Sequence, residues 1–422
     1  MSNSDPRLCA IRALARVVAG SHLQDVLAEF DSHMHRGLIY EITFGVLRHW
    51  FSLNELLDRT LDQPRRLNNT LTKCALLAGI YQLAHMKTPS YAVVSESVRV
   101  VRQLKQRWAT GLVNATLRNC SLDHRPSSAS AVHEAPRWLI QALQSEHPDQ
   151  WSTLLRTLRT RAPLALRVNA RRGDVDAYVA KFGSGLSLRT GFDSYSFTLA
   201  KPLPRSELPA HSERWVTIQD ETSQRAISIL DPRPHDRVLD ACAAPGIKSL
   251  QLAERHPDIE LVSIDVDASA SAWLDQECTR LGVAANVSSG DATTLDWWDG
   301  EMFDRILLDA PCSGTGTLRR HPDIKIHRRP ADVDRVARLQ SELLRNLWRT
   351  LKPGGTLLYT TCSILERENQ CVVEAFLECT SSAESAPLSV AEGCSRTVGQ
   401  LVLPQEGGGD GFYFCLLTKT RD

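Results

Sequence analysis

The chain has 422 residues, and its 49 Lys and Arg residues balance its 49 Asp and Glu residues, so the formal net charge is zero. This length exceeds what one ordinary hydrophobic core fills, and 42% hydrophobic with 23% charged residues is typical of a multidomain globular protein. No uncharged apolar run approaches the roughly 18 residues that span a bilayer, and the amino terminus lacks an apolar signal segment.

The cysteines point to a reducing compartment. All 11 occur without a Cys-x-x-Cys pair, which argues against a zinc ribbon and against a dithiol redox motif. We therefore expect reduced thiols, a cytoplasmic location, no bound metal and no association with a membrane.

Residues 1–125 are predicted to form an all-α bundle. Apolar residues recur at helical spacing in 36–48, 71–83 and 92–104. The region carries 16 Lys and Arg residues against 10 Asp and Glu residues, an excess that is compatible with polyanion binding and equally with an ordinary solvated surface.

Two shorter segments follow the bundle. Residues 126–136 lack periodicity and large apolar side chains, so they are predicted to be a linker. Residues 137–213 are predicted to form a small α+β module, with a helix from Trp138 to about Arg161 and a strand at 164–169.

Residues 214–422 are predicted to form a Rossmann-like α/β domain with a doubly wound parallel sheet. Short apolar strands alternate with helical segments such as 268–281 and 332–351. The predicted strand cores are 237–240, 261–265, 285–287, 305–308 and 356–359. Two further runs, 402–404 and 412–417, are joined by a glycine-rich turn and are predicted to close one edge of the sheet.

The carboxyl ends of the first three predicted strands indicate a nucleoside cofactor. The loop 240–248 opens a helix with small residues, which favours close approach of a ligand to backbone N–H groups. It is not a Gly-x-Gly-x-x-Gly loop, so a dinucleotide is disfavoured. Asp265 lies 19 positions beyond Gly246, where a carboxylate suits a ribose diol. Asp291 supplies a second acid after the third strand.

Two cysteines follow the next two strands. Cys312 lies in Asp-Ala-Pro-Cys-Ser-Gly, which begins at Asp309, and Cys362 lies in Thr-Thr-Cys-Ser. Parallel strands bring their carboxyl ends to one edge of a sheet, so both thiols are expected there. A nucleophilic thiol with a helper suits attack on a pyrimidine ring, whereas an isolated cysteine would more simply be a small buried hydrophobe.

These motifs resemble those of the RNA cytosine-C5 methyltransferases that use S-adenosylmethionine. The resemblance rests on the Asp-x-Cys-Ala-Ala-Pro-Gly loop at 240–246, the Asp-Ala-Pro-Cys-Ser-Gly-Thr-Gly motif at 309–316 and the Thr-Cys-Ser motif at 361–363. Segments 41–48 and 113–118 are similar to a NusB-like RNA-binding domain, a fusion found in enzymes that modify small-subunit ribosomal RNA.

The resemblance implies a role for each motif. Cys362 would be the nucleophile that adds to C6 of cytosine, Cys312 would assist product release, and Asp309 would hydrogen-bond the N3/N4 edge of the base. The implied S-adenosylmethionine site comprises Cys242, Ala243, Ala244, Pro245, Gly246, Ile247, Lys248, Asp265, Asp291 and Asp309. The implied substrate is small-subunit ribosomal RNA, and we expect a monomer.

Candidate RNA contacts come from three places, since a target base must leave its stack to reach a thiol. In the small module and near the predicted active edge they are Arg167, Asn169, Arg319, Arg320, His321 and Lys325. In the bundle they are Arg99, Arg102, Lys105, Arg107 and Arg118.

One residue departs from the family pattern, and three alternatives stay open. Ile247 stands where the family usually has a second glycine; a positive φ there would strain a β-branched residue and weaken cofactor binding. The alternatives are the same chemistry on transfer RNA, an RNA-binding or assembly factor with a vestigial enzyme, and a nicotinamide-dependent oxidoreductase. The missing glycine-rich fingerprint disfavours the last.

Overall fold

The computed structural model describes residues 5–123, 125–388, 390 and 393–421. Its contacts divide the chain into two compact units. The helical unit comprises Met1–Thr160 and Leu318–Arg329, and the sheet unit comprises Arg161–Thr317 and Pro330–Asp422. Within the described residues, no helix has both the length and the hydropathy required to cross a bilayer. Residues 1–4, where we expect no secretory signal, lie outside the described part.

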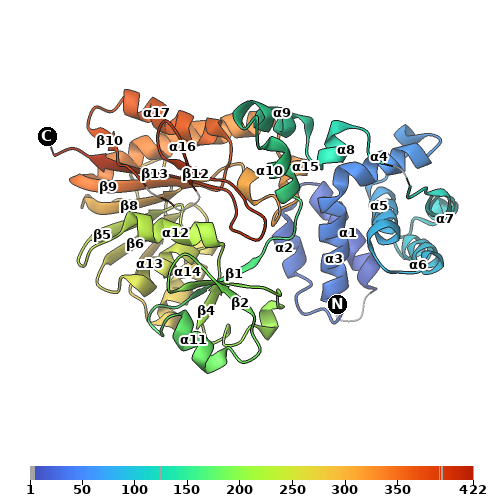
Figure 1. Cartoon of the computed structure of the whole chain (residues 1–422), viewed down its shortest axis with the longest axis horizontal. Helices are drawn as coiled ribbons and strands as arrows, with labels where there is room; N and C mark the ends of the chain where they lie inside the picture. The colour runs from blue at the N-terminus through green and yellow to red at the C-terminus, as the bar shows by residue number, and fades with distance from the viewer. Residues whose placement is uncertain (1–4, 124, 389, 391–392, 422) are drawn as a thin grey trace. The chain divides into compact units, whose positions relative to one another are not determined.

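The helical unit confirms the predicted all-α bundle (Figure 1). Its elements are α1 (Pro6–Val18), α2 (Leu23–Ala28), α3 (Arg36–Arg48), α4 (Trp50–Thr60), η1 (Pro64–Arg66), α5 (Thr70–His85), α6 (Ser90–Gln103), η2 (Arg107–Ala109), α7 (Thr110–Asn119), α8 (Ala129–His133), α9 (Arg137–Glu146), α10 (Trp151–Thr157) and α15 (Ile324–His327).

Helix α5 is the centre of this bundle. Most of its residues are buried, and the Asn69 side chain caps its amino end by accepting a hydrogen bond from the backbone N–H of Thr72 at 2.9 Å. Helices α3 and α5 are so close at Gly45 that a Cβ there would lie 2.0 Å from the Tyr81 ring. The Tyr81 hydroxyl in turn donates to Glu41 on α3 at 2.6 Å.

The segment predicted to be a linker is folded instead. Residues 126–136 contain α8, and Glu134 directly after it is 2% exposed and has a positive φ of 51°. Its carboxylate accepts hydrogen bonds from the backbone N–H groups of Phe51 and Ser52. By its contacts, the chain up to Thr160 groups with the helical unit, so this unit includes the first residues of the module predicted at 137–213. The sequence of 126–136 gave no sign of a folded segment, because its residues are mostly small or polar. The turn is held by one buried carboxylate, that of Glu134.

The sheet unit contains two sheets. The smaller sheet comprises β1 (Leu164–Val168), β2 (Leu188–Thr190), β3 (Ser196–Leu199) and β4 (Val216–Ile218), together with α11 (Val175–Phe182) and η3 (Arg205–Glu207). The larger part comprises α12 (Glu221–Leu230), β5 (Arg237–Ala241), α13 (Ile247–Arg255), β6 (Glu260–Asp265), α14 (Ala268–Leu281), β7 (Asn286–Ser289), β8 (Phe303–Asp309), η4 (Thr315–Thr317), α16 (Pro330–Thr350), β9 (Leu351–Thr361), η5 (Glu366–Glu368), α17 (Gln370–Glu378), β10 (Ala383–Ser385), β11 (Gly393–Ser395), β12 (Gln400–Val402) and β13 (Phe412–Lys419).

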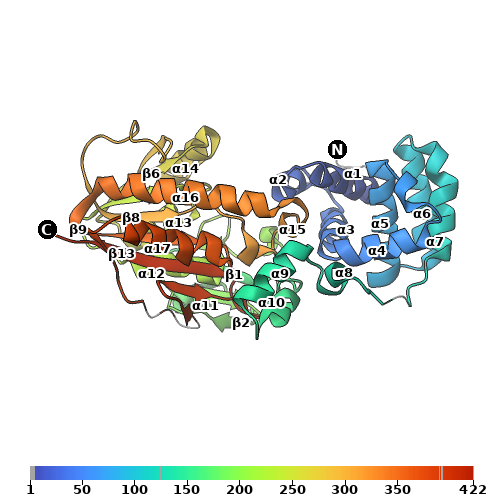
Figure 2. The same ribbon diagram turned by 90° about the horizontal axis from the view of Figure 1, so that it is seen from above.

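The larger sheet has the order β11-β12-β13-β9-β8-β5-β6-β7, with β10 paired to β13. Strands β5 to β9 are parallel and β13 is antiparallel to β9, so the predicted Rossmann-like domain and its closing edge are confirmed. Helices α16 and α17 lie on one face, and α12, α13 and α14 lie on the other (Figures 1 and 2). The apolar, near-continuous strands follow from burial on both faces.

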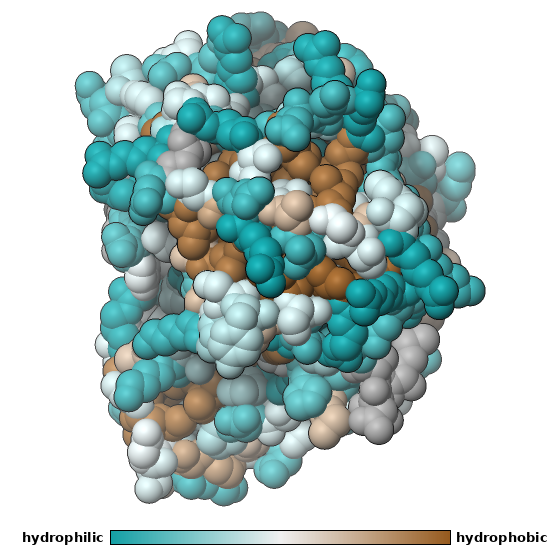
Figure 3. All heavy atoms as spheres, turned by 90° about the vertical axis from the view of Figure 1, so that its right-hand side faces the viewer, coloured by the Kyte–Doolittle hydropathy of each residue, from teal (hydrophilic) through white to brown (hydrophobic). Residues whose placement is uncertain are grey.

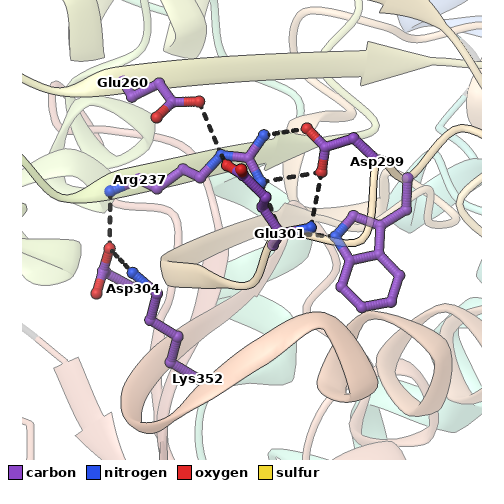
Figure 4. A network of polar contacts seen from close by, with 7 residues as sticks. Arg237, Glu260, Asp299, Glu301, Asp304 and Lys352 are labelled. Atoms are coloured by element: carbon purple, nitrogen blue, oxygen red, sulfur yellow. Dashed lines mark hydrogen bonds and ion pairs between the residues drawn. The ribbon is translucent and has the colours of Figure 1, made fainter.

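Charged residues bind the amino ends of four neighbouring strands to one another (Figure 4). Arg237 begins β5; its guanidinium donates to Glu260 on β6 at 2.8 Å and pairs with Asp299. Its backbone N–H donates to Asp304 on β8 at 2.9 Å, and Lys352 on β9 donates to the same carboxylate at 2.7 Å. Cation and carboxylates alternate, so every charge in the network has an opposite neighbour.

Candidate active site

The two thiols singled out in the sequence lie together. Cys312 follows β8 and Cys362 directly follows β9; these strands are parallel neighbours, and the two sulfurs are 3.2 Å apart. The backbone N–H of Gly316 donates to the carbonyl of Cys362 at 2.9 Å and so joins the two loops. Gly316 has no room for a side chain, because a Cβ would lie 2.2 Å from the carbonyl oxygen of Gly411.

The surroundings of Cys312 favour the protonated form of its thiol. The hydrogen bond with Cys362, together with burial, raises the pKa of Cys312 well above its ordinary value. Cys312 therefore keeps its proton at neutral pH and is suited to be the proton donor of the pair. The thiolate is the reactive form of cysteine, so one thiol of this pair must lose its proton before it can attack a base.

A cation lies beside Asp309 at the end of β8. The Lys248 ammonium forms an ion pair with the Asp309 carboxylate and is 5.6 Å from the centre of the Phe412 ring. Burial by itself would lower the pKa of Lys248, but the Asp309 carboxylate outweighs it, so the pKa is raised. Lys248 is thus a fixed positive charge that orients Asp309.

The loop between β5 and α13 has an unusual backbone. Cys242 has φ of 58° and Gly246 has φ of 92°, and a Cβ on Gly246 would lie 2.4 Å from Leu274. Gly246 is therefore required both by conformation and by space. Ile247 is the first residue of α13 and is not among the described residues with positive φ, so its β-branched side chain creates no backbone strain.

The other residues of the loop pack in the interior or donate backbone hydrogen bonds to β6. Burial raises the pKa of Cys242, so its thiol stays protonated and serves as a packing group of the loop. Ala243 donates its backbone N–H to the Ile264 carbonyl at 3.0 Å, and Ala244, which precedes Pro245, donates to Asp265 at 2.9 Å. The loop is thereby held against the end of β6.

Two more carboxylates follow the next strands of the sheet. Asp265 ends β6; one oxygen accepts from Ala244 and the other from the backbone N–H of Asp267 at 2.9 Å. Asp291 follows β7, is exposed, and accepts from the backbone N–H and hydroxyl of Thr293. Each carboxylate oxygen has further lone pairs, so both residues can still accept from a ligand.

Asp240 is a buried acid that sequence reasoning did not single out as a site residue. It is 0% exposed, and one oxygen accepts from the Ser249 hydroxyl at 2.5 Å. The other oxygen has no hydrogen-bond partner among the residues that the structure describes. Burial raises the pKa of Asp240 to about 7, so the group is partly protonated near neutrality.

Three family comparisons cover most of the chain. Residues 227–418 match the 16S rRNA methyltransferase RsmB/F family, residues 4–122 match the NusB family, and residues 135–202 match the ferredoxin-like domain of RsmF/B-like methyltransferases. "Ribosomal RNA small subunit methyltransferase B" of Pseudomonas putida is 39% identical, with 98% of each chain covered. The protein of the same name from Pseudomonas syringae pv. tomato is 38% identical over 98% of this chain and 97% of its own.

The chain belongs to the RsmB/F methyltransferase family. A methyltransferase homolog from Pyrococcus horikoshii, solved by crystallography, is 25% identical over 67% of this chain and 99% of its own, with a TM-score of 0.58. A further crystal structure covers 99% of both chains with a TM-score of 0.86 at 22% identity, which shows that the whole fold is shared.

Arg167 and Asn169, two predicted RNA contacts of this RsmB/F chain, lie in the interior. Arg167 is 2% exposed; its guanidinium donates to Gln219 at 2.8 Å and pairs with Glu254 on α13. Asn169 is 5% exposed, and its side chain accepts from the backbone N–H of Arg171. Side chains so enclosed offer RNA little surface, which argues against both predicted contacts.

The contacts of the segment after the Cys312 motif group it with the helical unit. This segment comprises Leu318–Arg329. Arg319 is 2% exposed and Lys325 is 5% exposed; the Lys325 ammonium donates to the carbonyls of Arg48 and Glu134. Burial here argues against direct RNA contact by these two residues. Arg320 and His321 remain half-buried.

The basic residues of the bundle are the more accessible candidates. Helices α6 and α7 border a groove of about 380 Å³, lined by Tyr91, Val94, Ser95, Val98, Arg99, Arg102, Asn114 and Arg118. Tyr91 is 80% exposed, and the three arginines of the groove are exposed as well. Figure 3 looks on to the side of the helical unit that carries α6 and α7, and shows hydrophobic side chains exposed among hydrophilic ones.

Proposed function

We propose that this protein transfers a methyl group from S-adenosylmethionine to C5 of a cytosine in small-subunit (16S) ribosomal RNA. The observation that carries the proposal is the pair of thiols 3.2 Å apart, on loops after neighbouring parallel strands, with Asp309 at the end of one of these strands. Membership of the RsmB/F family and the names of the Pseudomonas relatives support the choice of RNA.

Cys362 activates the base in this proposal. C5 of cytosine is a poor nucleophile, but a thiolate that adds to C6 pushes electron density on to C5. Asp309, held by Lys248, would hydrogen-bond the N3/N4 edge and stabilise the adduct. S-Adenosylmethionine supplies an electrophilic methyl group when it is bound.

Product release needs a second step at the same carbons. A water molecule takes the C5 proton, the electrons of the C5–H bond re-form the C5–C6 double bond, and the Cys362 sulfur departs as a thiolate with the electrons of the C6–S bond. Cys312 would assist this elimination, because its retained proton lies beside the departing sulfur.

The residues present fit the cofactor. The loop 242–248 would hold the methionine end, Asp265 the ribose hydroxyls and Asp291 the adenine. The carboxylates of Asp265 and Asp291 keep free lone pairs for hydroxyl and amine donors, which suits a nucleoside. Because Ile247 is unstrained, the argument for a vestigial enzyme loses its support in the backbone.

The test is methyl transfer to defined RNA. The purified chain is incubated with radiolabelled S-adenosylmethionine and either unmodified 16S ribosomal RNA or unmodified transfer RNA, and the product is digested to nucleosides. We expect label in 5-methylcytidine from 16S RNA, absent with Cys362→Ala and retained with Cys379→Ala, which removes an exposed thiol elsewhere. Label only in transfer RNA would replace the substrate; cofactor binding without transfer to either RNA would contradict the proposal.

A further inference from the structure

The buried carboxylate of Glu368 contacts the two loops that carry the thiols and has no role in the mechanism above. Glu368 ends η5 and is 0% exposed. Its carboxylate accepts from the Ser313 backbone N–H at 2.6 Å and from the Ser313 hydroxyl at 2.5 Å. It also accepts from the Ser363 hydroxyl at 2.7 Å.

These three bonds join the two thiol-bearing loops. Ser313 directly follows Cys312, and Ser363 directly follows Cys362. A single carboxylate therefore holds the residue next to each sulfur, one loop from β8 and the other from β9. The Ser313 and Ser363 hydroxyls are themselves 3.4 Å apart, so the bridge is compact.

Glu368 is itself fixed in place. The Tyr359 hydroxyl donates to the Glu368 carbonyl at 2.6 Å. The next residue, Asn369, donates its side-chain amide to the Ser363 carbonyl at 2.9 Å and accepts from the Thr361 hydroxyl at 2.6 Å. The carboxylate is thus anchored to β9 on one side and reaches the Cys312 loop on the other.

Charge and burial agree with a structural clamp. Burial raises the pKa of Glu368, and the hydrogen bonds from Ser313 and Ser363 partly offset that increase. Burying a carboxyl group costs free energy unless its oxygens accept hydrogen bonds. Here one oxygen of Glu368 accepts hydrogen bonds from two hydroxyls.

We propose that Glu368 is a positioning residue that sets the separation of Cys312 and Cys362 by clamping Ser313 to Ser363. Among the described residues, the hydrogen bonds of its carboxylate go to the serines and not to the sulfurs, although its charge contributes to the raised pKa of Cys312. The geometric claim stands apart from the methyl-transfer proposal, whereas its consequence for catalysis rests on that proposal. An error of about 1 Å in the position of a reacting group costs on the order of 100-fold in rate, so the clamp would matter for product release.

The thiol separation can be measured without substrate. Diamide oxidises two neighbouring thiols to a disulfide and takes up the two electrons and two protons that they lose. The rate at which the Cys312–Cys362 disulfide forms, followed by mass spectrometry of the linked peptides, reports how often the sulfurs meet. Peptide mapping separates this pair from the other nine cysteines.

Two conservative variants separate reach from charge. Glu368→Asp keeps the carboxylate but is one methylene too short to bridge both serines, so disulfide formation should slow by about tenfold or more. Glu368→Gln keeps the reach, and the serine hydroxyls can turn to accept from its amide, so its rate should equal the wild-type rate or exceed it, because the lost charge lowers the pKa of Cys312. Val373→Ala, a cavity variant of the buried face of α17, controls for lost stability.

The outcomes are distinct. A Glu368→Asp rate equal to that of Val373→Ala would overturn the proposal, as would a slow Glu368→Gln beside a normal Glu368→Asp. With RNA, we expect Glu368→Asp to accumulate more covalent adduct per turnover than Val373→Ala. If the wild-type protein methylates no RNA, the proposed function fails, while the diamide rates still decide whether Glu368 sets the thiol separation.

Discussion

In the larger sheet, the polar residues at the amino ends of the strands have different surroundings from those at the carboxyl ends. At the amino ends, Arg237 pairs with carboxylates that are themselves largely exposed, such as Asp299 and Glu260, so the network is neutralised and hydrated (Figure 4). At the carboxyl ends, a thiol pair follows β8 and β9, and the carboxyl end of β5 holds a fully enclosed acid, Asp240, one oxygen of which has no hydrogen-bond partner among the described residues. Burial shifts pKa values there, which is typical of functional sites.

Charge content alone does not distinguish the candidate active site from the opposite end of the strands. Both ends hold an ion pair, Arg237 with Asp299 and Lys248 with Asp309. Positive φ occurs at both ends, at His235 and Gly300 as well as at Cys242 and Gly246. Among the described residues, only the carboxyl-end pair lies in the site that holds the two thiols. Substitutions at the amino end should therefore change stability, and those at the carboxyl end should change chemistry.

The largest expected effect is at the thiols. Cys362→Ala should abolish both methyl transfer and the covalent RNA adduct, because the nucleophile is lost. Cys312→Ala should instead accumulate the adduct, because attack is retained and release is impaired. Denaturing gel electrophoresis of the protein with labelled RNA measures the adduct.

Adduct with both thiol variants, or with neither, would contradict the assignment of roles. Cys415→Ala, which removes a buried thiol from β13, serves as a control for general loss of a cysteine.

The next effect is at the cation of the site. Lys248→Met should reduce kcat/KM by about 100-fold, because Asp309 loses the partner that orients it. Steady-state methylation kinetics measure this change. Circular dichroism should show a folded protein, and an unchanged kcat/KM would mean that the ion pair has no part in catalysis.

A pH-dependent effect is expected at Asp240. Its folded-state pKa of about 7 is above the ordinary value near 4, so the native state retains a proton that the unfolded chain has lost. The stability associated with the neutral acid is full below about pH 4 and declines as the pH rises to about 7.

Asp240→Asn removes that titration. The difference in unfolding free energy between wild type and variant should therefore fall between about pH 4 and pH 7 and then level off, by a total of about 1–4 kcal/mol. Urea unfolding at several pH values measures it. A difference independent of pH would show that Asp240 titrates normally.

The smallest effect is expected at the amino end. Arg237→Met should lower the free energy of unfolding by about 2 kcal/mol, since it removes charge-assisted hydrogen bonds to partly hydrated partners. Thermal unfolding measures the loss, while kcat of the folded enzyme at low temperature should equal that of wild type. A reduced kcat with normal stability would erase the contrast between the two ends.

Much of the site follows from the sequence for a simple reason. Asp265, Asp309, Cys312 and Cys362 each stand at or just beyond the end of an apolar strand, and parallel strands collect such residues at one edge. Local order along the chain therefore predicts proximity. Glu368 escaped notice because a glutamate in a short turn carries no periodic signal; only its burial between two loops reveals it.

The RNA candidates show the opposite case. Arg167 and Lys325 are cations in positions that suit RNA binding by sequence, yet each is enclosed and bonded within its own unit. A charge becomes a binding group or a structural one according to the partners around it, and these partners are distant in sequence. Glu254 is 87 residues from Arg167, and the Glu134 carbonyl is 191 residues from Lys325.

The all-α bundle, the parallel sheet and the meeting of the two thiols follow from the sequence alone, because apolar periodicity and strand ends are local properties. Tertiary structure alone decided that the segment 126–136 folds around Glu134, that Leu318–Arg329 joins the helical unit, and that Glu368 bridges the thiol loops. Each depends on a buried polar group, whose cost is offset only by hydrogen bonds from residues that the chain brings together on folding.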